Sequence, residues 1–531
     1  MSESFRVLVA DRIAPEELGP LREDSRFELL VHPAPSPDEL LSLVADVDAL
    51  VVRSATRVTR AVIEAAPRLR IIGRAGVGVD TIDVPAATEF GIAVVNAPAG
   101  NTVSAAELAF ALLLSLARRI PAADRSMKAG EWSRAKFNGI ELSGKTLGLV
   151  GVGRIGGEVA ARARAFGMRV VAYDPFLAEE RARELGVAML PLEQLLDEAD
   201  ALSLHVPLTD TTAGMIGAAQ LARLRSGALL VNAARGGVVD EAALADALRE
   251  GRLGGAALDV FAEEPLPAGH PLRGIDGLVL TPHLGASTRE AQRNVAAEIA
   301  EAVRDALLHG DLARAVNAPA VSGERMRALR PLLLLAEQLG RLAAVLHGGA
   351  VERAEVMYAG DGEGVLRPLA ATAMVGVLSG VVGPQGVNFV NALHLAAQRG
   401  IRVEERGRPT DSREAEVTLV LAGGGRRVSV GGVLLAPDRA RLVAIDDYRI
   451  DLAPRGTLLV LRNRDVPGVI GRVGTLLGDA GINIAEYHQA RLAAGGEALA
   501  AVSVDGALDA PMLARLRDSS DVLSAEQVRL D

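Results

Sequence analysis

Short apolar runs alternate with segments of helical periodicity from Phe5 to about Leu312. Strands that alternate with helices are typical of parallel sheets carrying helices on both faces. About 300 residues is long for one such sheet, so we expect two doubly wound α/β domains. The runs that predict strands are Arg6–Ala10, Ala49–Val52, Arg70–Ile72, Ala93–Val95, Thr146–Val150, Arg169–Tyr173, Ala201–Leu204, Leu229–Val231 and Leu278–Leu280.

One expected helix in this region is apolar nearly all round. It begins at Ser104, which has capping-box spacing to Glu107, and continues as LAFALLLSLARRI. A helix without a polar face is usually buried, so we expect it between domains or subunits. A packing role alone explains this pattern without any catalytic function.

The α/β rhythm stops near Pro319. Residues 320–450 contain two helical stretches and then a β-rich, glycine-rich region, which predicts an α+β domain. Residues 455–531 predict a compact βαββαβ unit of ferredoxin-like order. Its expected elements are Thr457–Arg462, Gly468–Ala480, Asn483–Leu492, Glu497–Asp505, Pro511–Asp518 and Val522–Leu530.

Composition narrows the classes of function. The 531 residues are 49% hydrophobic and 23% charged, with a net charge of −10. An acidic chain disfavours nucleic acid and anionic membranes as partners. The chain has no cysteine, which excludes disulfides and thiolate chemistry, and its eight histidines form no metal-binding pattern. Without a signal-peptide pattern or a spanning apolar segment, we expect a cytoplasmic protein.

A glycine-rich turn follows the expected strand Thr146–Val150. It reads Gly151-Val-Gly153-Arg-Ile-Gly156, a helix follows it, and the next strand ends at Asp174. Strand, glycine turn, helix and acid in this order are the fingerprint of a dinucleotide site. The alternative is a glycine turn that binds nothing, and the complete context argues against it.

The positions in this turn have separate physical reasons. Gly151 allows the tight turn, Gly153 lets the backbone approach a pyrophosphate, and Gly156 allows close helix packing. The N–H groups of Arg154 and Ile155 then face the phosphates at a helix N-terminus. The acid after the second strand accepts hydrogen bonds from the adenosine ribose and repels a 2′-phosphate, which favours NAD over NADP.

Three later motifs each place a titratable or charged residue after an expected strand: Arg235, Glu264 and His283. Hydroxy-acid oxidation needs these three residue types. A histidine takes the hydroxyl proton, a carboxylate fixes its tautomer, and an arginine grips the substrate carboxylate. In isolation, each residue also has a purely structural explanation.

The three motifs, in this order after the glycine turn, resemble the D-isomer-specific 2-hydroxy-acid dehydrogenase family. The segments 73–80, 96–101, 205–207 and 316–317 also look like family motifs. The chain is most similar to the family's long form, and the resemblance covers essentially all 531 residues. It implies two flavodoxin- or Rossmann-like domains, an α+β intervening domain and a C-terminal ACT domain.

The resemblance implies a domain division. Residues 1–98 and 284–316 would form a discontinuous substrate domain, around an NAD-binding domain at 99–283. Residues 320–450 would be the intervening domain, similar to an allosteric substrate-binding domain, and 455–531 the ACT domain. The apolar helix 104–119 would lie at a dimer interface, and the expected assembly is a homotetramer.

The resemblance also implies residue roles. Arg235 would bind the substrate carboxylate and carbonyl, Glu264 would be the partner of His283, and His283 would be the acid/base. Glu264 is chosen over Glu263 because it immediately precedes Pro265. Further cofactor-site residues would be Val206, Ala233, Ala234, Asp259, Gly285 and Ala286.

The implied substrate is 3-phospho-D-glycerate, the entry point to L-serine biosynthesis. Its contacts would be Arg53, Ser54, Arg74, Gly76 and Asn101, and loop 132–136 would approach a neighbouring subunit's site. The alternative for Arg53 and Arg74 is that they are solvated charges on the surface without a role in binding. Two alternatives stay open: another D-2-hydroxy-acid dehydrogenase, such as a hydroxypyruvate or glyoxylate reductase, and an NAD(H)-sensing binding protein.

The last unit resembles an amino-acid-binding ACT domain. The implied effector is L-serine, with Asp465 pairing with its ammonium and Asn483 receiving its carboxylate. Asn463 stands where some serine-regulated relatives carry a bulkier aromatic residue. The alternative is a dimerisation module with a degenerate pocket.

Overall fold

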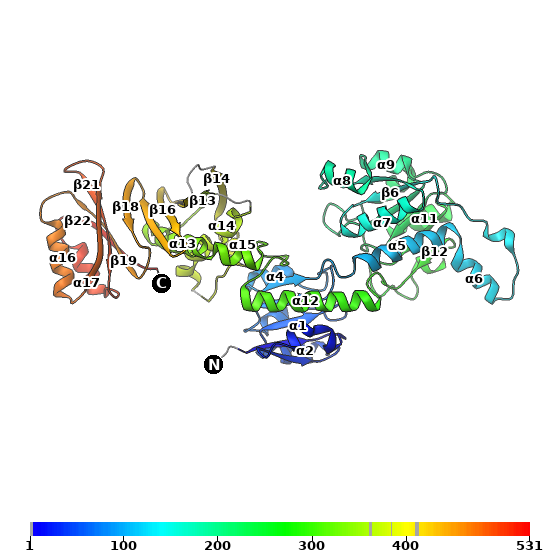
Figure 1. Cartoon of the computed structure of the whole chain (residues 1–531), viewed down its shortest axis with the longest axis horizontal. Helices are drawn as coiled ribbons and strands as arrows, with labels where there is room; N and C mark the ends of the chain where they lie inside the picture. The colour runs from blue at the N-terminus through cyan, green and yellow to red at the C-terminus, as the bar shows by residue number, and fades with distance from the viewer. Residues whose placement is uncertain (1–3, 361–363, 384, 409–413, 531) are drawn as a thin grey trace.

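The computed structural model describes residues 4–360, 364–383, 385–408 and 414–530. The ends of the expected first and last units, residues 1–3 and Asp531, lie outside the described residues. Four sheets are found in the described chain, arranged as an elongated molecule with the first sheet near the middle (Figure 1).

The first sheet is parallel, with the strand order β2-β1-β3-β4-β5. Its strands are β1 (Phe5–Val9), β2 (Phe27–Val31), β3 (Ala49–Val52), β4 (Ile71–Arg74) and β5 (Ala93–Asn96). The connecting helices are α1 (Gly19–Arg22), α2 (Pro37–Leu43), α3 (Arg60–Glu64) and α4 (Val84–Glu89). Separate apolar clusters cover its two faces, as a doubly wound sheet requires.

The second sheet is also parallel, with the order β12-β11-β10-β9-β6-β7-β8. Its strands are β6 (Thr146–Val150), β7 (Arg169–Tyr173), β8 (Ala188–Met189), β9 (Ala201–Leu204), β10 (Leu229–Asn232), β11 (Gly255–Leu258) and β12 (Leu278–Leu280). Its helices are α5 (Thr102–Ala117), α6 (Ile120–Lys128), α7 (Arg154–Ala165), α8 (Glu179–Leu185), α9 (Leu192–Glu198), α10 (Ala218–Arg223) and α11 (Glu241–Arg249). The strand order reverses between β6 and β9, where doubly wound sheets bind ligands.

After the second sheet the chain returns to the first. The long helix α12 (Arg289–His309) lies beside β4, where a Cβ at Gly73 would be 2.8 Å from the Val303 side chain. Farther along, the Asn317 side chain accepts from the Val94 N–H and donates to the Ile92 carbonyl. The first unit is therefore built from two segments of the chain, one before and one after the second unit in the sequence.

The expected start of the apolar helix is wrong. Helix α5 begins at Thr102, so Ser104 lies inside its first turn and caps nothing. Its hydroxyl instead lies 2.7 Å from the Thr288 hydroxyl, and Glu107 pairs with Arg162. The helix is buried within the second unit, where it packs against α7 and the second sheet, and its expected place between domains or subunits stays a prediction.

The third unit combines three helices with a six-stranded sheet of order β14-β13-β15-β16-β17-β18. Its helices are α13 (Gly323–His347), α14 (Leu366–Val382) and α15 (Ala392–Gln398). Its strands are β13 (Arg353–Ala359), β14 (Arg402–Arg408), β15 (Ala415–Gly423), β16 (Arg426–Ala436), β17 (Arg439–Ile445) and β18 (Tyr448–Leu452). Strand β13, between the first two helices, was not expected.

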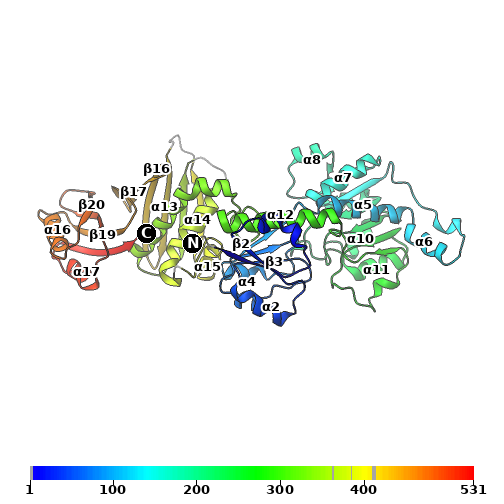
Figure 2. The ribbon, with the colours of Figure 1, turned by 60° about the horizontal axis from the view of Figure 1, so that its bottom comes forward.

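The last unit has the expected βαββαβ order. Its elements are β19 (Thr457–Arg464), α16 (Val469–Asp479), β20 (Ile484–Arg491), β21 (Glu497–Val504), α17 (Ala510–Arg517) and β22 (Val522–Arg529). The sheet order is β20-β21-β19-β22. Leu458 and Val460 of β19 share an apolar cluster with α13, so the third unit covers the sheet face opposite the two helices (Figure 2).

Within the described residues, no helix is long and apolar enough to cross a membrane. The same residues contain no group of three or more His, Asp or Glu side chains that could hold a metal ion.

Candidate active site

The expected site residues gather at the carboxyl ends of the strands of both parallel sheets. On the second sheet, Gly151–Gly156 follow β6, Asp174 follows β7, Val206 follows β9, Ala233, Ala234 and Arg235 follow β10, Asp259 and Glu264 follow β11, and His283, Gly285 and Ala286 follow β12. On the first sheet, Arg53 and Ser54 follow β3, Arg74 ends β4 with Gly76 just beyond it, and Asn101 lies between β5 and α5.

The glycine turn has the shape that a dinucleotide requires. Gly151 has a φ of 88°, and a Cβ there would lie 2.6 Å from the His205 carbonyl oxygen. A Cβ at Gly156 would lie 2.3 Å from the Gly151 carbonyl oxygen, whereas one at Gly153 would meet no atom within 4 Å. The open space over Gly153, beside the N-terminus of α7, therefore fits a pyrophosphate.

The Asp174 carboxylate braces this turn. One oxygen accepts from the Val152 N–H at 2.9 Å and the other from the Phe176 N–H at 3.0 Å. Each carboxylate oxygen has two lone pairs, so both retain capacity for ribose hydroxyls. The acid thus orders the turn and still offers hydrogen-bond acceptors beside it.

The backbone carbonyl of His205 lies against the glycine turn, and no role for the His205 side chain was expected from the sequence. Its ring Nε2 lies 2.9 Å from the Ser203 hydroxyl. Burial lowers the pKa of His205 to about 4, so the ring is neutral near pH 7. The signal in the sequence was its place directly after β9, next to the glycine turn.

The central contact joins His283 and Glu264. His283 Nδ1 lies 2.7 Å from Glu264 Oε2. This hydrogen bond, which outweighs partial burial, raises the pKa of His283 above its ordinary value. Burial alone would raise the pKa of Glu264, but hydrogen bonds from His283 and the Phe261 N–H hold it below its usual range.

Asp259 holds the turn that carries His283. Its fully buried carboxylate accepts from the Thr281 hydroxyl, the Leu284 N–H and the Gly285 N–H. Burial raises the pKa of Asp259 in spite of these hydrogen bonds. His283 has a φ of 54°, which non-glycine residues adopt rarely, so the turn must be held in place by such contacts.

The loop after β10 is held by a residue that the sequence did not single out. The Asn232 side chain donates to the Arg235 carbonyl at 2.9 Å and accepts from the Ala234 N–H at 3.1 Å. The guanidinium of Arg235 is bound in turn to Asp80, in the loop after β4. Arg235 therefore joins the two parallel-sheet units.

Three arginines form a positive field at this junction. Burial lowers the pKa of Arg74 to about 10; Asp11 opposes the fall, and the charges of Arg235 and Arg53 contribute to it. Arg74 Nε and Asn101 Oδ1 are buried without a hydrogen-bond partner among the described residues. Clustered guanidinium groups and buried polar atoms without a hydrogen-bond partner are what an anionic, hydroxyl-bearing ligand would satisfy.

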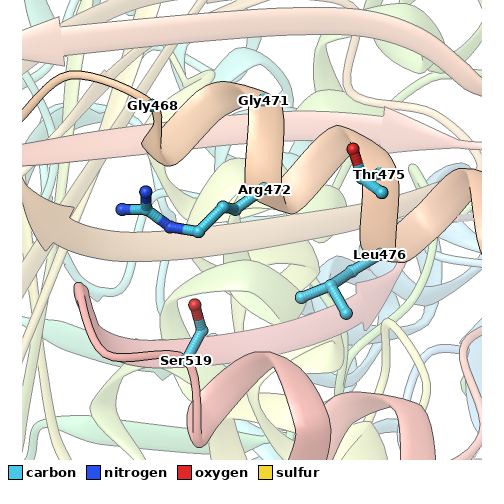
Figure 3. A pocket seen from close by; sticks show the side chains of 6 residues that line it. All are labelled: Gly468, Gly471, Arg472, Thr475, Leu476 and Ser519. Carbon is cyan, nitrogen blue, oxygen red and sulfur yellow. The ribbon is translucent and has the colours of Figure 1, made fainter.

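The residues expected to bind an effector have partners within the last unit. Asp465 accepts from Arg491 and from the Gly495 N–H, and Asn483 donates to Asp505. The hydrogen bond from Gly495 and then that from Arg491 lower the pKa of Asp465. A separate groove of about 580 Å³ lies along α16, with Arg472, Thr475 and Leu476 on one side and Ser519 opposite (Figure 3).

Three family models match the chain. Residues 110–285 match the D-isomer specific 2-hydroxyacid dehydrogenase NAD-binding domain, 328–446 the D-3-phosphoglycerate dehydrogenase intervening domain, and 457–520 the ACT domain. The D-3-phosphoglycerate dehydrogenase of Synechocystis sp. is 42% identical over 99% of this chain and 95% of its own. That of Bacillus subtilis is 41% identical over 99% of this chain and 100% of its own.

The chain belongs to the D-3-phosphoglycerate dehydrogenase family. Shorter dehydrogenases share part of its structure. A glyoxylate reductase from Paecilomyes thermophila covers 59% of this chain and 98% of its own, with 32% identity and a TM-score of 0.54. D-lactate dehydrogenase from Aquifex aeolicus, solved with NAD and lactic acid, covers 59% and 98%, with 29% identity and a TM-score of 0.53.

These findings confirm the expected family, the fold class and NAD as the cofactor. The intervening and ACT models match residues beyond the part shared with the shorter dehydrogenases. The chain therefore has the long form of the family, as expected from the sequence.

Replacing Glu264 by Gln should lower the pKa of His283, because the strongest interaction that raises it is lost. The shift is measured by NMR titration of the His283 ring in histidine-labelled protein. Glu263→Gln is the matched control, since it is Glu264 that accepts the hydrogen bond from His283 Nδ1. An unchanged His283 pKa in Glu264→Gln, or an equal fall in Glu263→Gln, would contradict the pairing.

Proposed function

We propose that this protein oxidises 3-phospho-D-glycerate to 3-phosphooxypyruvate with NAD⁺, the first step of L-serine biosynthesis. One observation carries the proposal: His283 and Glu264 form a hydrogen-bonded pair. This pair lies at the edge of the second sheet where the strands end and where the glycine turn and Arg235 also lie. Full-length similarity to D-3-phosphoglycerate dehydrogenases supports the substrate.

The residues of the cofactor site follow from the fold. The N–H groups of Arg154 and Ile155 would meet the pyrophosphate, and Asp174 the adenosine ribose. Val206, Ala233, Ala234, Gly285 and Ala286 would line the groove toward the nicotinamide. Asp259 would act through the turn it holds, because its oxygens already accept hydrogen bonds from that turn.

Proton transfer belongs to the His283–Glu264 pair. Glu264 accepts the Nδ1 proton of His283, which leaves Nε2 as the base for the C2 hydroxyl of the substrate. When Nε2 removes the proton of the C2 hydroxyl, the hydroxyl becomes a carbonyl as hydride leaves C2. NAD⁺, when bound, accepts that hydride. The protonated imidazole is stabilised by the neighbouring carboxylate, and in the reverse direction it returns the proton.

Substrate binding belongs to the arginines. The guanidinium of Arg235 would hold the C1 carboxylate and the developing carbonyl through parallel hydrogen bonds. Arg53, Ser54 and Arg74, with Gly76 and Asn101, would hold the phosphate end. Burial is the main cause of the lowered pKa of Arg74, and the charges of Arg235 and Arg53 add to it, so a bound phosphate dianion would stabilise this guanidinium.

The domain division, assembly and regulation are proposed on the same basis. Residues 1–98 with 284–316 would bind substrate and 99–283 would bind NAD, with the intervening domain at 320–450. The ACT unit at 455–531 would bind L-serine between subunits of a cytoplasmic homotetramer. The hydrogen bonds from Arg491 and Gly495 both go to Asp465 Oδ2, and Asn483 donates to Asp505 through one Nδ2 hydrogen. Serine would therefore meet Asp465 Oδ1 and the second Nδ2 hydrogen of Asn483 beside these partners.

The phosphate contacts predict a preference that can be measured. With NADH, the protein should reduce 3-phosphooxypyruvate with a kcat/KM at least about 100-fold above that for hydroxypyruvate, since charge-assisted contacts to phosphate are lost with the latter. Arg53→Ala should reduce this ratio by about tenfold or more. Equal rates for the two oxo acids would favour a general hydroxy-acid reductase, and inactivity with both an NAD(H)-binding protein.

Asp174→Ala should weaken NADH binding by about tenfold and narrow the difference between NADH and NADPH, because the carboxylate both binds ribose and repels a 2′-phosphate. Both dissociation constants are measured by nucleotide fluorescence. Glu179→Ala, which removes a carboxylate at the start of α8, is the control. An unchanged ratio of the two constants would refute the ribose role.

A further inference from the structure

We propose that Asp80 and Gly78, in the loop after β4, position the Arg235 guanidinium for the substrate carboxylate. The inference rests on the proposed function, in which Arg235 binds that carboxylate. It adds two residues of the first unit to a site whose acid, base and cofactor turn all belong to the second. Both act through Arg235 and have no direct part in the chemistry.

The guanidinium of Arg235 is held at two points. Its Nε lies 3.2 Å from Asp80 Oδ2, and its Nη1 donates to the Ala234 carbonyl at 2.7 Å. A guanidinium is planar, so the hydrogen bond to Ala234, together with the ion pair to Asp80, restricts the orientation of the whole fork. The second Nη1 hydrogen and the two Nη2 hydrogens are then left for a ligand.

Gly78 provides the space in which this fork lies. A Cβ at position 78 would be 2.1 Å from Arg235 Nη2 and 2.9 Å from its Cζ. Asp80 Oδ2 would lie 2.4 Å from the same Cβ, so the nearest atoms are the ends of the two paired side chains and not backbone. A methyl group at this position would therefore push the guanidinium and the carboxylate out of their present arrangement, without a clash with backbone among the three nearest atoms.

Asp80 also acts on a second arginine, Arg74. Burial is the main cause of the lowered pKa of Arg74; the charges of Arg235 and Arg53 add to the fall and Asp80 opposes it, so Asp80 is a counter-ion shared by neighbouring arginines. Its side chain is 64% exposed and that of Arg235 only 24%. The carboxylate thus stays hydrated while it restrains a mostly buried cation, which avoids the cost of burying both charges.

The contact crosses between the two sheets. Asp80 follows β4 of the first sheet, and Arg235 follows β10 of the second. The orientation of Arg235 therefore depends on both units being in place, which would couple their approach to the binding of the substrate carboxylate. A competing role is that Asp80 occupies Arg235 in place of substrate, and the two roles predict opposite changes in KM.

Asp80→Asn is the direct test, in the full-length protein with NADH and 3-phosphooxypyruvate. If Asp80 positions Arg235, KM for the oxo acid rises about tenfold while KM for NADH stays within about twofold. The control is Glu64→Gln, which removes an exposed carboxylate that pairs with Arg60 on α3 of the same unit. A lower KM would show competition, and an unchanged KM would show no role; either overturns the inference.

Two further variants separate positioning from a general loss of charge. Gly78→Ala keeps every charge and should raise KM for the oxo acid in the same way. In an Arg235→Lys background, which removes the fork, Asp80→Asn should change KM by less than about twofold. A normal KM in Gly78→Ala, or an undiminished effect of Asp80→Asn beside Lys, would overturn the inference.

Turnover by the wild-type protein distinguishes a failure of the positioning role from a failure of the proposed function. Wild-type turnover of 3-phosphooxypyruvate with an unaltered Asp80→Asn variant would overturn only the positioning role. A wild-type protein without turnover would overturn the proposed function and the positioning role together.

Discussion

The hydrogen bond between His283 Nδ1 and Glu264 Oε2 is the interaction on which the site depends. It selects the tautomer, sets which ring nitrogen can meet a substrate, and raises the pKa of the histidine. The two residues follow different strands, β12 and β11, so the bond exists only because these strands pair in parallel register. Asp259 then holds the His283 turn in a backbone conformation that the residue would otherwise rarely adopt.

The rest of the architecture brings other chemistry to the same place. The carboxyl ends of parallel strands lie at the same edge of a sheet. The glycine turn, Arg235 and the acid–base pair follow such ends, so all of them lie at one edge of the second sheet. The first sheet contributes Arg53 and Arg74 from its own carboxyl ends. Helix α12 and Asn317 return the chain to the first sheet and hold the two halves of that unit together.

Much of this was predictable from the sequence, for identifiable reasons. The glycine turn and the arrangement of the last unit depend on local patterns, and both expectations agree with the structure. Glu264 was preferred to Glu263 from its place before Pro265, and it is Glu264 that contacts His283. Such short-range patterns carry their geometry with them.

The remaining features depend on contacts between distant segments. Helix α5 begins at Thr102, and the hydroxyl of Ser104 contacts Thr288 across the fold, which no local capping rule reveals. The ion pair between Asp80 and Arg235 joins loops that follow strands of two different sheets, and it lies where a side chain at Gly78 would clash with both partners. Patterns in the sequence pointed to these segments, but they could not show which atoms of distant segments come into contact.

The central claim is that His283 is the proton-transfer group of a dinucleotide-dependent dehydrogenase. Its most direct test measures NADH affinity and 3-phosphooxypyruvate reduction in His283→Ala. The account predicts an NADH dissociation constant within about threefold of wild type and a kcat at least about 1,000-fold lower, since acid–base catalysis contributes on that order. Retention of full turnover by this variant would contradict the account.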